Sequence, residues 1–220
     1  LVVGRKGVDR PWTVSIVRET IKVDSVRLEW KPGDIAYVRL AFFSEDTSSQ
    51  FTKVVNEVLG KKTRGIVLDL RGDPGGMLDA AIDVASAWIG RQPAVLEDVR
   101  GERTPFNGTA DARLIGIPTF VLVDGGSASA SEIVSGALQD YGVATIVGTQ
   151  SFGKGTVQDY QELPDGASVK LTVAQWLTPK GRSIQEVGIT PDKIIEFTAE
   201  QAKAGKDPQL DYALKSIANQ

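Results

Sequence analysis

Short apolar runs alternate with amphipathic helical patterns through the middle of this chain of 220 residues. Runs with the length and composition of strands lie at residues 35–43, 65–70, 118–123 and 144–147. Apolar residues at helical spacing lie between them, at residues 51–59, 78–89 and 132–141. Units of strand, helix and strand close by right-handed crossovers, so the pattern predicts an α/β fold with a largely parallel sheet and flanking helices.

The two ends of the chain differ from this alternating core. Residues 157–163 and 169–177 flank a Pro-Asp-Gly turn, which predicts a β-hairpin, and the tail from Pro208 has the apolar spacing of a short helix. Near the start, residues 13–17 and 21–26 are β-branched runs typical of edge or linking strands. We therefore expect a domain boundary at Val26, with residues 1–26 separate from a core of residues 27–220.

The chain has no histidine and no cysteine, which excludes several classes of site. A Ser-His-Asp triad, a thiolate nucleophile, a disulfide framework and an ordinary zinc site all need one of these residues. A net charge of −3 provides no basic surface for nucleic acid. We therefore expect no metal, no cofactor and no nucleic-acid partner, and a serine nucleophile in this chain would need lysine as its base.

A serine-rich turn precedes the third helical pattern, where Ser127, Ser129 and Ser131 alternate with alanine after two glycines. Small neighbours leave a hydroxyl accessible, which suits a nucleophile. The same residues fit a helix cap, because Ser129 stands three positions before Glu132, the spacing of a capping box. Taken alone, the motif favours the cap, and its spacing does not select one serine as a nucleophile.

A glycine-rich loop that contains Lys154 has part of the phosphate-binding pattern G-x-x-x-x-G-K-[ST], beginning at Gly148. Gly155 stands where that motif needs a Ser or Thr to hold Mg²⁺, and a strand pattern follows instead of a helix. The loop therefore does not indicate an NTPase. Lys154 is a candidate base for a serine, a role in which it must be neutral near pH 7, and burial or a nearby positive charge favours that state.

A second glycine pair, Gly75 and Gly76, lies between a predicted buried strand and a predicted helix. Backbone N–H groups at such a helix N-terminus stabilise negative charge, as in an oxyanion hole. Taken alone, Pro74 and the two glycines are more typical of a tight turn.

Four sequence blocks in a fixed order cover much of the chain. They are GIVLDLRGDPGG at residues 65–76, VDGGSASASEIVSGAL at 123–138, GTQSFGKGTVQ at 148–158 and LTPKGRSIQEVGITPD at 177–192. Together these blocks resemble the carboxyl-terminal processing proteases, also called tail-specific proteases. The resemblance implies a Ser/Lys endopeptidase that cleaves protein substrates near their C-terminus.

The resemblance assigns a role to each candidate residue. It implies Ser129 as the nucleophile, Lys154 as the general base and Gln158 as the amide that orients the lysine. The backbone N–H groups that it implies for the oxyanion hole belong to Ala130 and to Gly75 or Gly76. One departure is Asp73, where related proteins often carry asparagine.

The resemblance also implies a crotonase/ClpP-like core and a peptide-binding PDZ domain. Residues 1–26 would be a remnant of that PDZ domain with the return into the core, and a start at Leu1 rather than Met favours a processed protein or a fragment. The partners would be proteins or peptides with free C-terminal tails, and a homo-oligomer or a regulatory partner would fit the family. The implied compartment is extracytoplasmic: the periplasm, the cell envelope or a plastid lumen.

Two other functions stay open at this point. A latent or inactive peptide-binding scaffold of the same fold would fit the missing peptide groove, although the presence of Ser129, Lys154 and Gln158 argues against it. A crotonase-like acyl-CoA enzyme would share the fold without needing the Ser/Lys pair.

Overall fold

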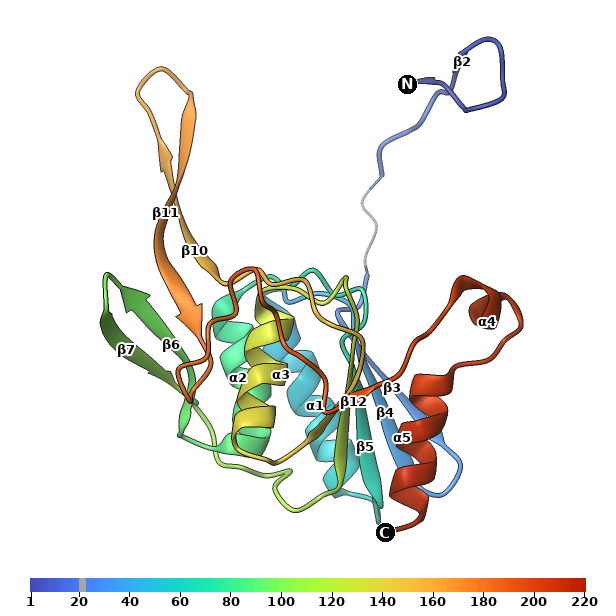
Figure 1. The fold of residues 1–220 in the computed structure, drawn as a ribbon, viewed down its shortest axis with the longest axis vertical. Coiled ribbons are helices and arrows are strands. Elements are labelled where there is room, and N and C mark those ends of the chain that lie inside the picture. Colours follow the sequence, from blue (N-terminus) through green and yellow to red (C-terminus); the bar gives the residue numbers. More distant parts are fainter. Residues whose placement is uncertain (20–22) are drawn as a thin grey trace.

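A six-stranded sheet forms the centre of the molecule, in a computed structural model that describes residues 1–19 and 23–220. The strand order is β12, β9, β8, β5, β4, β3 (Figure 1). These strands are β3 (Val26–Lys31), β4 (Ile35–Leu40), β5 (Gly65–Asp69), β8 (Thr119–Val123), β9 (Thr145–Gly148) and β12 (Lys193–Ile194). Neighbouring strands are parallel except for β3, which is antiparallel to β4. The expected α/β fold with a largely parallel sheet is therefore confirmed.

The helices cover the two faces of this sheet unequally. They are α1 (Thr47–Leu59), α2 (Leu78–Ile89), α3 (Ala130–Asp140), α4 (Ala199–Lys203) and α5 (Pro208–Ala218). Helices α1, α2 and α3 pack on one face around a core that includes Leu68, Trp88 and Leu138, whereas α5 packs on the other face through Ala213 and Ile217 (Figure 1). The order β4, β5, β8, β9 crosses the sheet in one direction, so right-handed crossovers place the connecting helices on one face.

The carboxyl ends of three adjacent parallel strands bring the candidate loops together. β5 leads into the loop with Gly75 and Gly76, β8 leads into the turn with Ser129, and β9 leads into the loop with Lys154. Adjacent parallel strands end at the same edge of a sheet, where ligands of open α/β sheets bind. The fold thus gathers segments that lie far apart in the sequence.

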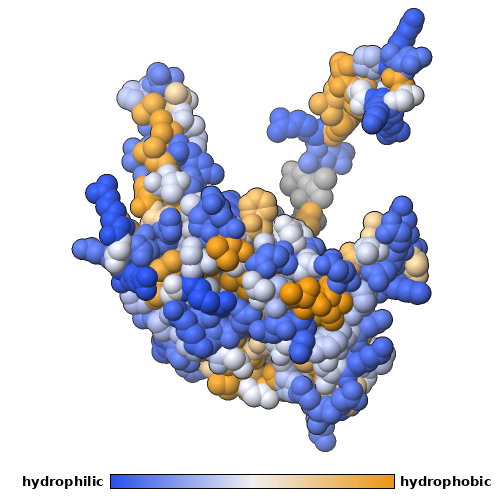
Figure 2. Space-filling view, viewed as in Figure 1, coloured by the Kyte–Doolittle hydropathy of each residue, from blue (hydrophilic) through white to orange (hydrophobic). Residues whose placement is uncertain are grey.

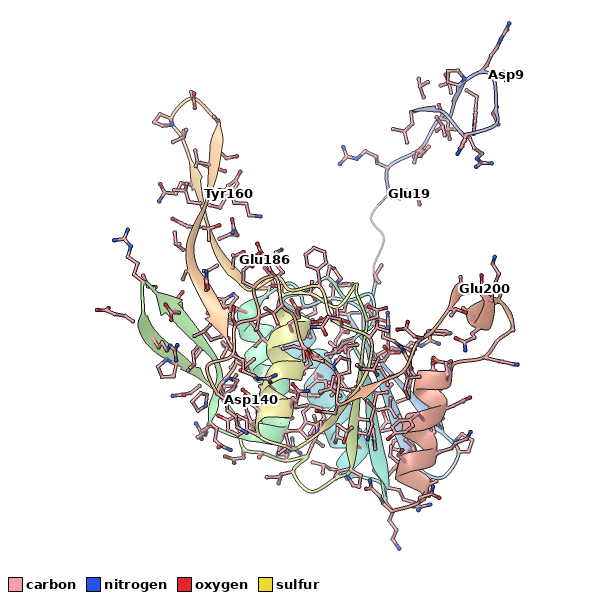
Figure 3. All side chains as sticks on the ribbon, viewed as in Figure 1. Asp9, Glu19, Asp140, Tyr160, Glu186 and Glu200 are labelled. Atoms are coloured by element: carbon pink, nitrogen blue, oxygen red, sulfur yellow. The ribbon has the colours of Figure 1, made fainter. Side chains whose placement is uncertain are left out.

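A second sheet of four strands, in the order β10, β11, β6, β7, extends from the side of the body. Its strands are β6 (Pro93–Val99), β7 (Glu102–Asn107), β10 (Thr156–Glu162) and β11 (Ser168–Leu177). The predicted hairpin of β10 and β11 is confirmed, and it projects from the body with exposed apolar side chains at Leu163, Leu171 and Val173 (Figures 1 and 2). Tyr160 lies on the projecting part (Figure 3). Because β11 pairs with β6 through residues 175–177, the hairpin is anchored at its base.

The N-terminal segment lies away from the body, as the positions of Asp9 and Glu19 show (Figures 1 and 3). It contains a small pair of strands, β1 (Val2–Val3) and β2 (Trp12–Thr13). The expected strand at residues 13–17 is wrong beyond Thr13, because exposed residues such as Val17 meet no partner strand there. Residues 21–22 of the expected strand at 21–26 lie outside the described residues. The expectation is wrong at residues 23–25, and β3 begins at Val26.

The other differences from the predicted elements are few. β4 ends at Leu40 rather than at residue 43, because the backbone of Phe43 bonds the glycine loop instead. Its N–H donates to the Gly75 carbonyl at 3.0 Å, and its carbonyl accepts from the Met77 N–H at 3.0 Å. The pattern missed β1, β6, β7, β12 and α4, and it missed β3 beyond Val26. Within the described ranges, no helix is long and apolar enough to cross a membrane.

Candidate active site

The serine turn between β8 and α3 holds Ser129 in an unusual backbone conformation. Its φ is 55° and its ψ is −112°, in a region that L-residues with side chains seldom occupy. Such strain persists only where the surrounding structure enforces it, and it is concentrated at functional sites. Ser129 and Glu132 form the capping box that the sequence predicts, and the Ser129 N–H donates to Glu132 Oε2 at 2.8 Å.

The three serines of the turn have different environments. The Ser127 hydroxyl is buried and donates to the Leu70 carbonyl at 2.8 Å. The Ser131 hydroxyl is also buried and donates to the Asp73 carbonyl at 3.1 Å. Ser129, in contrast, is partly exposed and lines a pocket. Of the three serines of the turn, Ser129 is therefore the accessible one.

That pocket, of about 330 Å³, brings Ser129, Lys154 and Gln158 together. The other residues that line it are Leu78, Thr156, Val157, Lys170 and Trp176. Across the described residues, Ser129 Oγ and Lys154 Nζ are not joined by a hydrogen bond. Bonds between a nucleophile and its base are often long in the absence of substrate.

A β-bulge directs Gln158 toward the pocket. The register of β10 on β11 shifts between Val157 and Gln158, so that Val157 lies opposite Ala174 and Gln158 lies opposite Thr172. Bulges of this kind re-aim a side chain relative to its strand. The Gln158 Nε2 donates to Thr172 Oγ1 at 2.7 Å and to Thr156 Oγ1 at 3.2 Å. With Nε2 held by the two threonines, Oε1 is the atom through which Gln158 can accept a bond from Lys154.

A buried carboxylate, Glu132, links the serine turn to the lysine loop. Its Oε2 accepts from the Ser129 N–H and from the Lys154 N–H, both at 2.8 Å. Its Oε1 accepts from the Gly153 N–H and from the Ser151 hydroxyl, both at 2.6 Å. The side chain is 0% exposed, and a buried charge needs such a set of donors. Glu132 thereby fixes the backbone of Ser129 relative to that of Lys154.

The glycine loop packs directly against the serine turn. A Cβ on Gly75 would lie 2.6 Å from the Ala128 carbonyl oxygen and 2.8 Å from the Ala130 nitrogen, and one on Gly76 would overlap the Phe43 carbonyl oxygen. With φ values of 94° and 146°, both positions require glycine. The Gly75 N–H already donates to Asp73 Oδ1 at 2.8 Å. Of the two glycines, Gly76 is therefore the better candidate for an oxyanion donor beside Ala130.

Asp73 is a buried acid within this loop. Its side chain is 0% exposed, and its Oδ2 has no hydrogen-bond partner among the described residues. Burial raises the pKa of the Asp73 carboxyl from its ordinary 3.8 to about 6, against the opposing effects of the Gly75 N–H, Ser131 and Arg39. The folded protein therefore holds a proton on Asp73 at pH values where an unfolded chain has lost it.

Asp73→Asn is expected to stabilise the protein near neutral pH and not in acid. Between about pH 4 and pH 6 the folded state binds more protons than the unfolded state, so the stability of the wild type falls as pH rises through this range. The difference between the two pKa values corresponds to roughly 3 kcal/mol. The cost of burying the asparagine side-chain nitrogen offsets part of this free energy, which leaves a gain in stability of about 1 to 2 kcal/mol at pH 7. Urea unfolding of both proteins from pH 4 to pH 8 measures it, and a gain that is independent of pH would contradict this account.

An ion-pair network anchors the start of the glycine loop. Arg71 donates from Nη2 to Asp69 Oδ2 at 2.6 Å and to Asp207 Oδ2 at 2.9 Å, and from Nη1 to Gln209 Oε1 at 3.0 Å. Asp207 is the N-cap of α5. Burial opposes the charge of Asp69, but the bonds from Arg71 outweigh it and lower the pKa of that carboxyl. The loop is thus fixed to β5 on one side and to α5 on the other.

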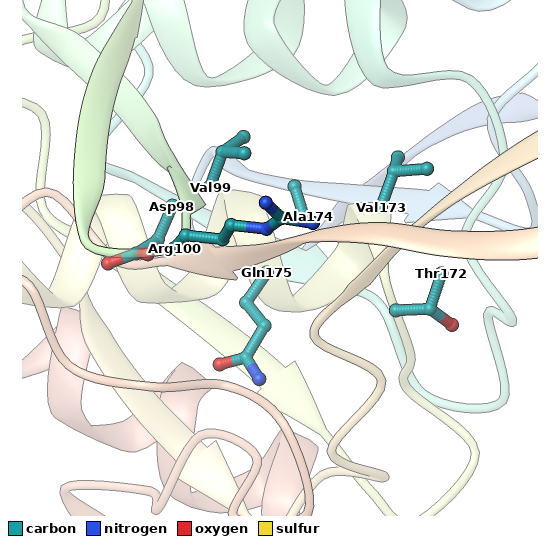
Figure 4. Close-up of a pocket in the computed structure, with 7 residues that line it drawn as sticks. All are labelled: Asp98, Val99, Arg100, Thr172, Val173, Ala174 and Gln175. Carbon is teal, nitrogen blue, oxygen red and sulfur yellow. The ribbon is translucent and has the colours of Figure 1, made fainter.

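A larger pocket, of about 730 Å³, shares no lining residue with the one that Ser129 lines. It is lined by the turn after β6 and by β11, at residues 98–100 and 172–175 (Figure 4). None of the candidate catalytic residues lines it. In the described part of the chain, no group of three or more acidic residues is placed to hold a metal ion.

The sequence patterns did not reveal the roles of Glu132 and Asp73. Glu132 was visible as the third residue of a capping box, but its bonds to residues 151–154 depend on how β9 lies beside β8. Asp73 stood out only as a departure from asparagine. In both cases the sequence showed only the residue type. The bonds of Glu132 and the burial of Asp73 depend on tertiary contacts.

Known proteins resemble this chain over most of its length. The profile of peptidase family S41 matches residues 34–195. The carboxy-terminal-processing protease of Bartonella bacilliformis is 44% identical over 218 residues, which cover 96% of this chain and 50% of that protein. The carboxy-terminal processing protease of Bacillus subtilis is 38% identical over 200 residues, which cover 90% and 42%. The solved structure of a photosystem II D1 C-terminal processing protease is 32% identical, with a TM-score of 0.73 over 85% of this chain and 52% of that one.

These matches cover most of this chain but a smaller share of each relative. The chain spans about half the length of the curated relatives it matches. Within the chain, the profile match includes the glycine loop, the serine turn and the lysine loop. On this evidence, the chain belongs to peptidase family S41.

Proposed function

We propose that the chain is the catalytic part of a serine endopeptidase that cleaves protein or peptide substrates near their C-terminus. One observation carries the proposal: the strained Ser129 and Lys154 line one pocket, and the buried Glu132 is bonded to the backbone of both. The relatives named as carboxy-terminal processing proteases support the substrate class.

In this mechanism Lys154 acts as both base and acid. The neutral amine accepts the Ser129 proton while Oγ attacks the carbonyl carbon of the scissile bond. The tetrahedral intermediate then collapses, the C–N bond breaks, and the lysine gives its proton to the leaving amine. Water, deprotonated by the same lysine, attacks the acyl-enzyme ester, and the Ser129 oxygen takes up the proton as it leaves. Gln158 orients Lys154 through Oε1 and moves no proton.

Two backbone N–H groups stabilise the oxyanion in this proposal. The Ala130 N–H begins α3, where the helix dipole favours negative charge. The second donor in this proposal is the Gly76 N–H of the glycine loop, in which the preceding residue, Gly75, lies against the serine turn. Gly75 contributes by its conformation, since its N–H is held by Asp73. Donors of this kind are each worth about 3 to 4 kcal/mol in comparable sites.

The same proposal includes the type of core fold, the origin of the N-terminal segment and the compartment. The α/β body is a crotonase/ClpP-like core of residues 27–220, and residues 1–26 are a remnant of a PDZ domain, a fold that binds C-termini as an added edge strand. The compartment is extracytoplasmic, and the protein acts on free C-terminal tails, as a homo-oligomer or with a regulatory partner where the full protein requires it. A latent scaffold of the same fold is the alternative.

Digestion of casein, an unstructured protein, tests the proposed activity, with mass spectrometry of the products. The wild type is expected to release peptides, and Ser129→Ala is expected to release none. Ser49→Ala, on the surface of α1, serves as the matched control and should behave as the wild type. Equal cleavage by the wild type and Ser129→Ala would contradict the proposal, and a wild type without cleavage would favour the scaffold.

A further inference from the structure

The pocket that contains Ser129 is lined by two lysines and, among the described residues, by no acid. Lys154 and Lys170 both contribute to its wall, and neither is part of a salt bridge within the described chain. The nearby carboxylate of Glu132 is buried and held by four donors, so it does not face the pocket. An electropositive pocket thus stands out in a chain whose net charge is −3.

Lys170 lies at a defined distance from the catalytic groups along the hairpin. It is paired with Tyr160, and the next pair toward the body on the same face is Thr172 with Gln158. Residues two positions apart on a strand share a face and are separated by about 7 Å. An extended peptide that passes Gln158 along this face therefore reaches Lys170 within a few residues.

The rest of the pocket suits the body of such a peptide. Leu78 of α2 and two residues of the hairpin, Val157 and Trp176, supply the apolar part of its wall. A volume of about 330 Å³ is at the small end of ligand pockets, which suits a short segment of chain. The apolar wall and a cation beyond it are complementary to a peptide segment that ends in a negative charge.

We propose that Lys170 binds the C-terminal carboxylate of the substrate and so determines that cleavage occurs a few residues from the end of the chain. This inference rests on the proposed function, because it names the feature that the same pocket recognises. Lys154 moves protons, whereas Lys170 transfers none and contributes a positive charge at the end of a flexible side chain. The recognition operates on the projecting part of the hairpin, one same-face pair beyond Gln158.

Peptide binding to the Ser129→Ala protein tests the inference without requiring turnover. Three fluorescent peptides are compared by anisotropy: one with a free C-terminal acid, the same sequence with a C-terminal amide, and a C-terminal amide whose last residue is replaced by glutamate. For a partly exposed charge pair, we expect the acid to bind about three- to fivefold more tightly than either amide. The acid-to-amide ratio should decrease as salt increases, because the pair is open to solvent.

Substitutions at Lys170 then identify the cation that is responsible. In the Ser129→Ala background, Lys170→Gln should bring the acid-to-amide ratio to about one, and Lys170→Glu should reverse the preference. Lys62→Gln, an exposed lysine before β5, is the matched control and should keep the ratio. A ratio that survives Lys170→Gln would overturn the inference. So would an amide ending in glutamate that binds as tightly as the acid, since the site would then recognise side-chain carboxylates.

The two proposals fail in different ways. A wild type that cleaves no casein refutes the proposed activity, but the binding ratio still decides the role of Lys170. Conversely, suppose that the wild type cleaves casein while the acid and the amide bind equally well. That result would support the proposed activity and contradict the carboxylate site.

Discussion

Lys154→Ala is expected to lower kcat/KM for a peptide substrate by at least about 10³-fold without changing the stability of the fold. The loss is large because serine is a poor nucleophile without a base, and groups that act as a unit lose most of their effect together. Stability should change by less than about 0.5 kcal/mol, because Lys154 is exposed and its contact with Glu132 uses the backbone N–H. The measurement is steady-state hydrolysis of a fluorogenic peptide, combined with urea unfolding.

A second substitution separates the loss of a base from the loss of a charge. Lys154→Arg keeps a positive charge but cannot deprotonate, so it should be as inactive as Lys154→Ala. Lys62→Ala should match the wild type. If Lys154→Ala kept the acidic limb of the wild-type pH–rate profile, the lysine would not be the base.

Glu132→Gln is expected to lower both activity and stability. The substitution keeps one side-chain oxygen but places an NH₂ group where the carboxylate accepts two N–H bonds, so two buried donors lose their partner. Each unpaired buried group costs about 1 to 3 kcal/mol, which gives a loss of roughly 3 kcal/mol in the free energy of unfolding. Activity should decrease by about 10²-fold or more in the folded variant, because displacement of a catalytic group by about 1 Å has that effect.

The control for Glu132→Gln is Glu45→Gln, which changes an exposed glutamate in the loop before α1. Kinetics should be measured well below the unfolding temperature, with circular dichroism to show that the variant is folded. Full activity in a folded Glu132→Gln protein would show that the carboxylate does not position the serine and the lysine. Normal stability would show that its four bonds are not needed for the fold.

Most of the fold was predictable because local pattern and tertiary environment agree. The strands at the centre of the sheet are continuous apolar runs, as burial on both faces requires, and α2 matches its predicted range of 78–89. β6 and β7 were missed because their charged residues and Pro105 weaken the strand pattern. β6 is paired on both sides, by β11 and by β7, and this pairing exists only in the folded chain.

The candidate site was predictable in its residues but not in their connections. The spacing in the serine turn left three serines open, and the structure distinguishes them because Ser127 and Ser131 donate to carbonyls of the glycine loop segment. The bulge that re-aims Gln158 has no signature in the sequence, since it arises from how β10 pairs with β11. The bonds of Glu132 depend in the same way on contacts between distant segments.

Ser129 and the lysine loop stand at opposite ends of the β8–α3–β9 crossover, and Glu132 joins them only when that crossover is closed. A newly made chain, or one damaged in either loop, holds its serine and its lysine at unrelated positions. The candidate site is therefore a property of the closed crossover, and neither loop forms it alone.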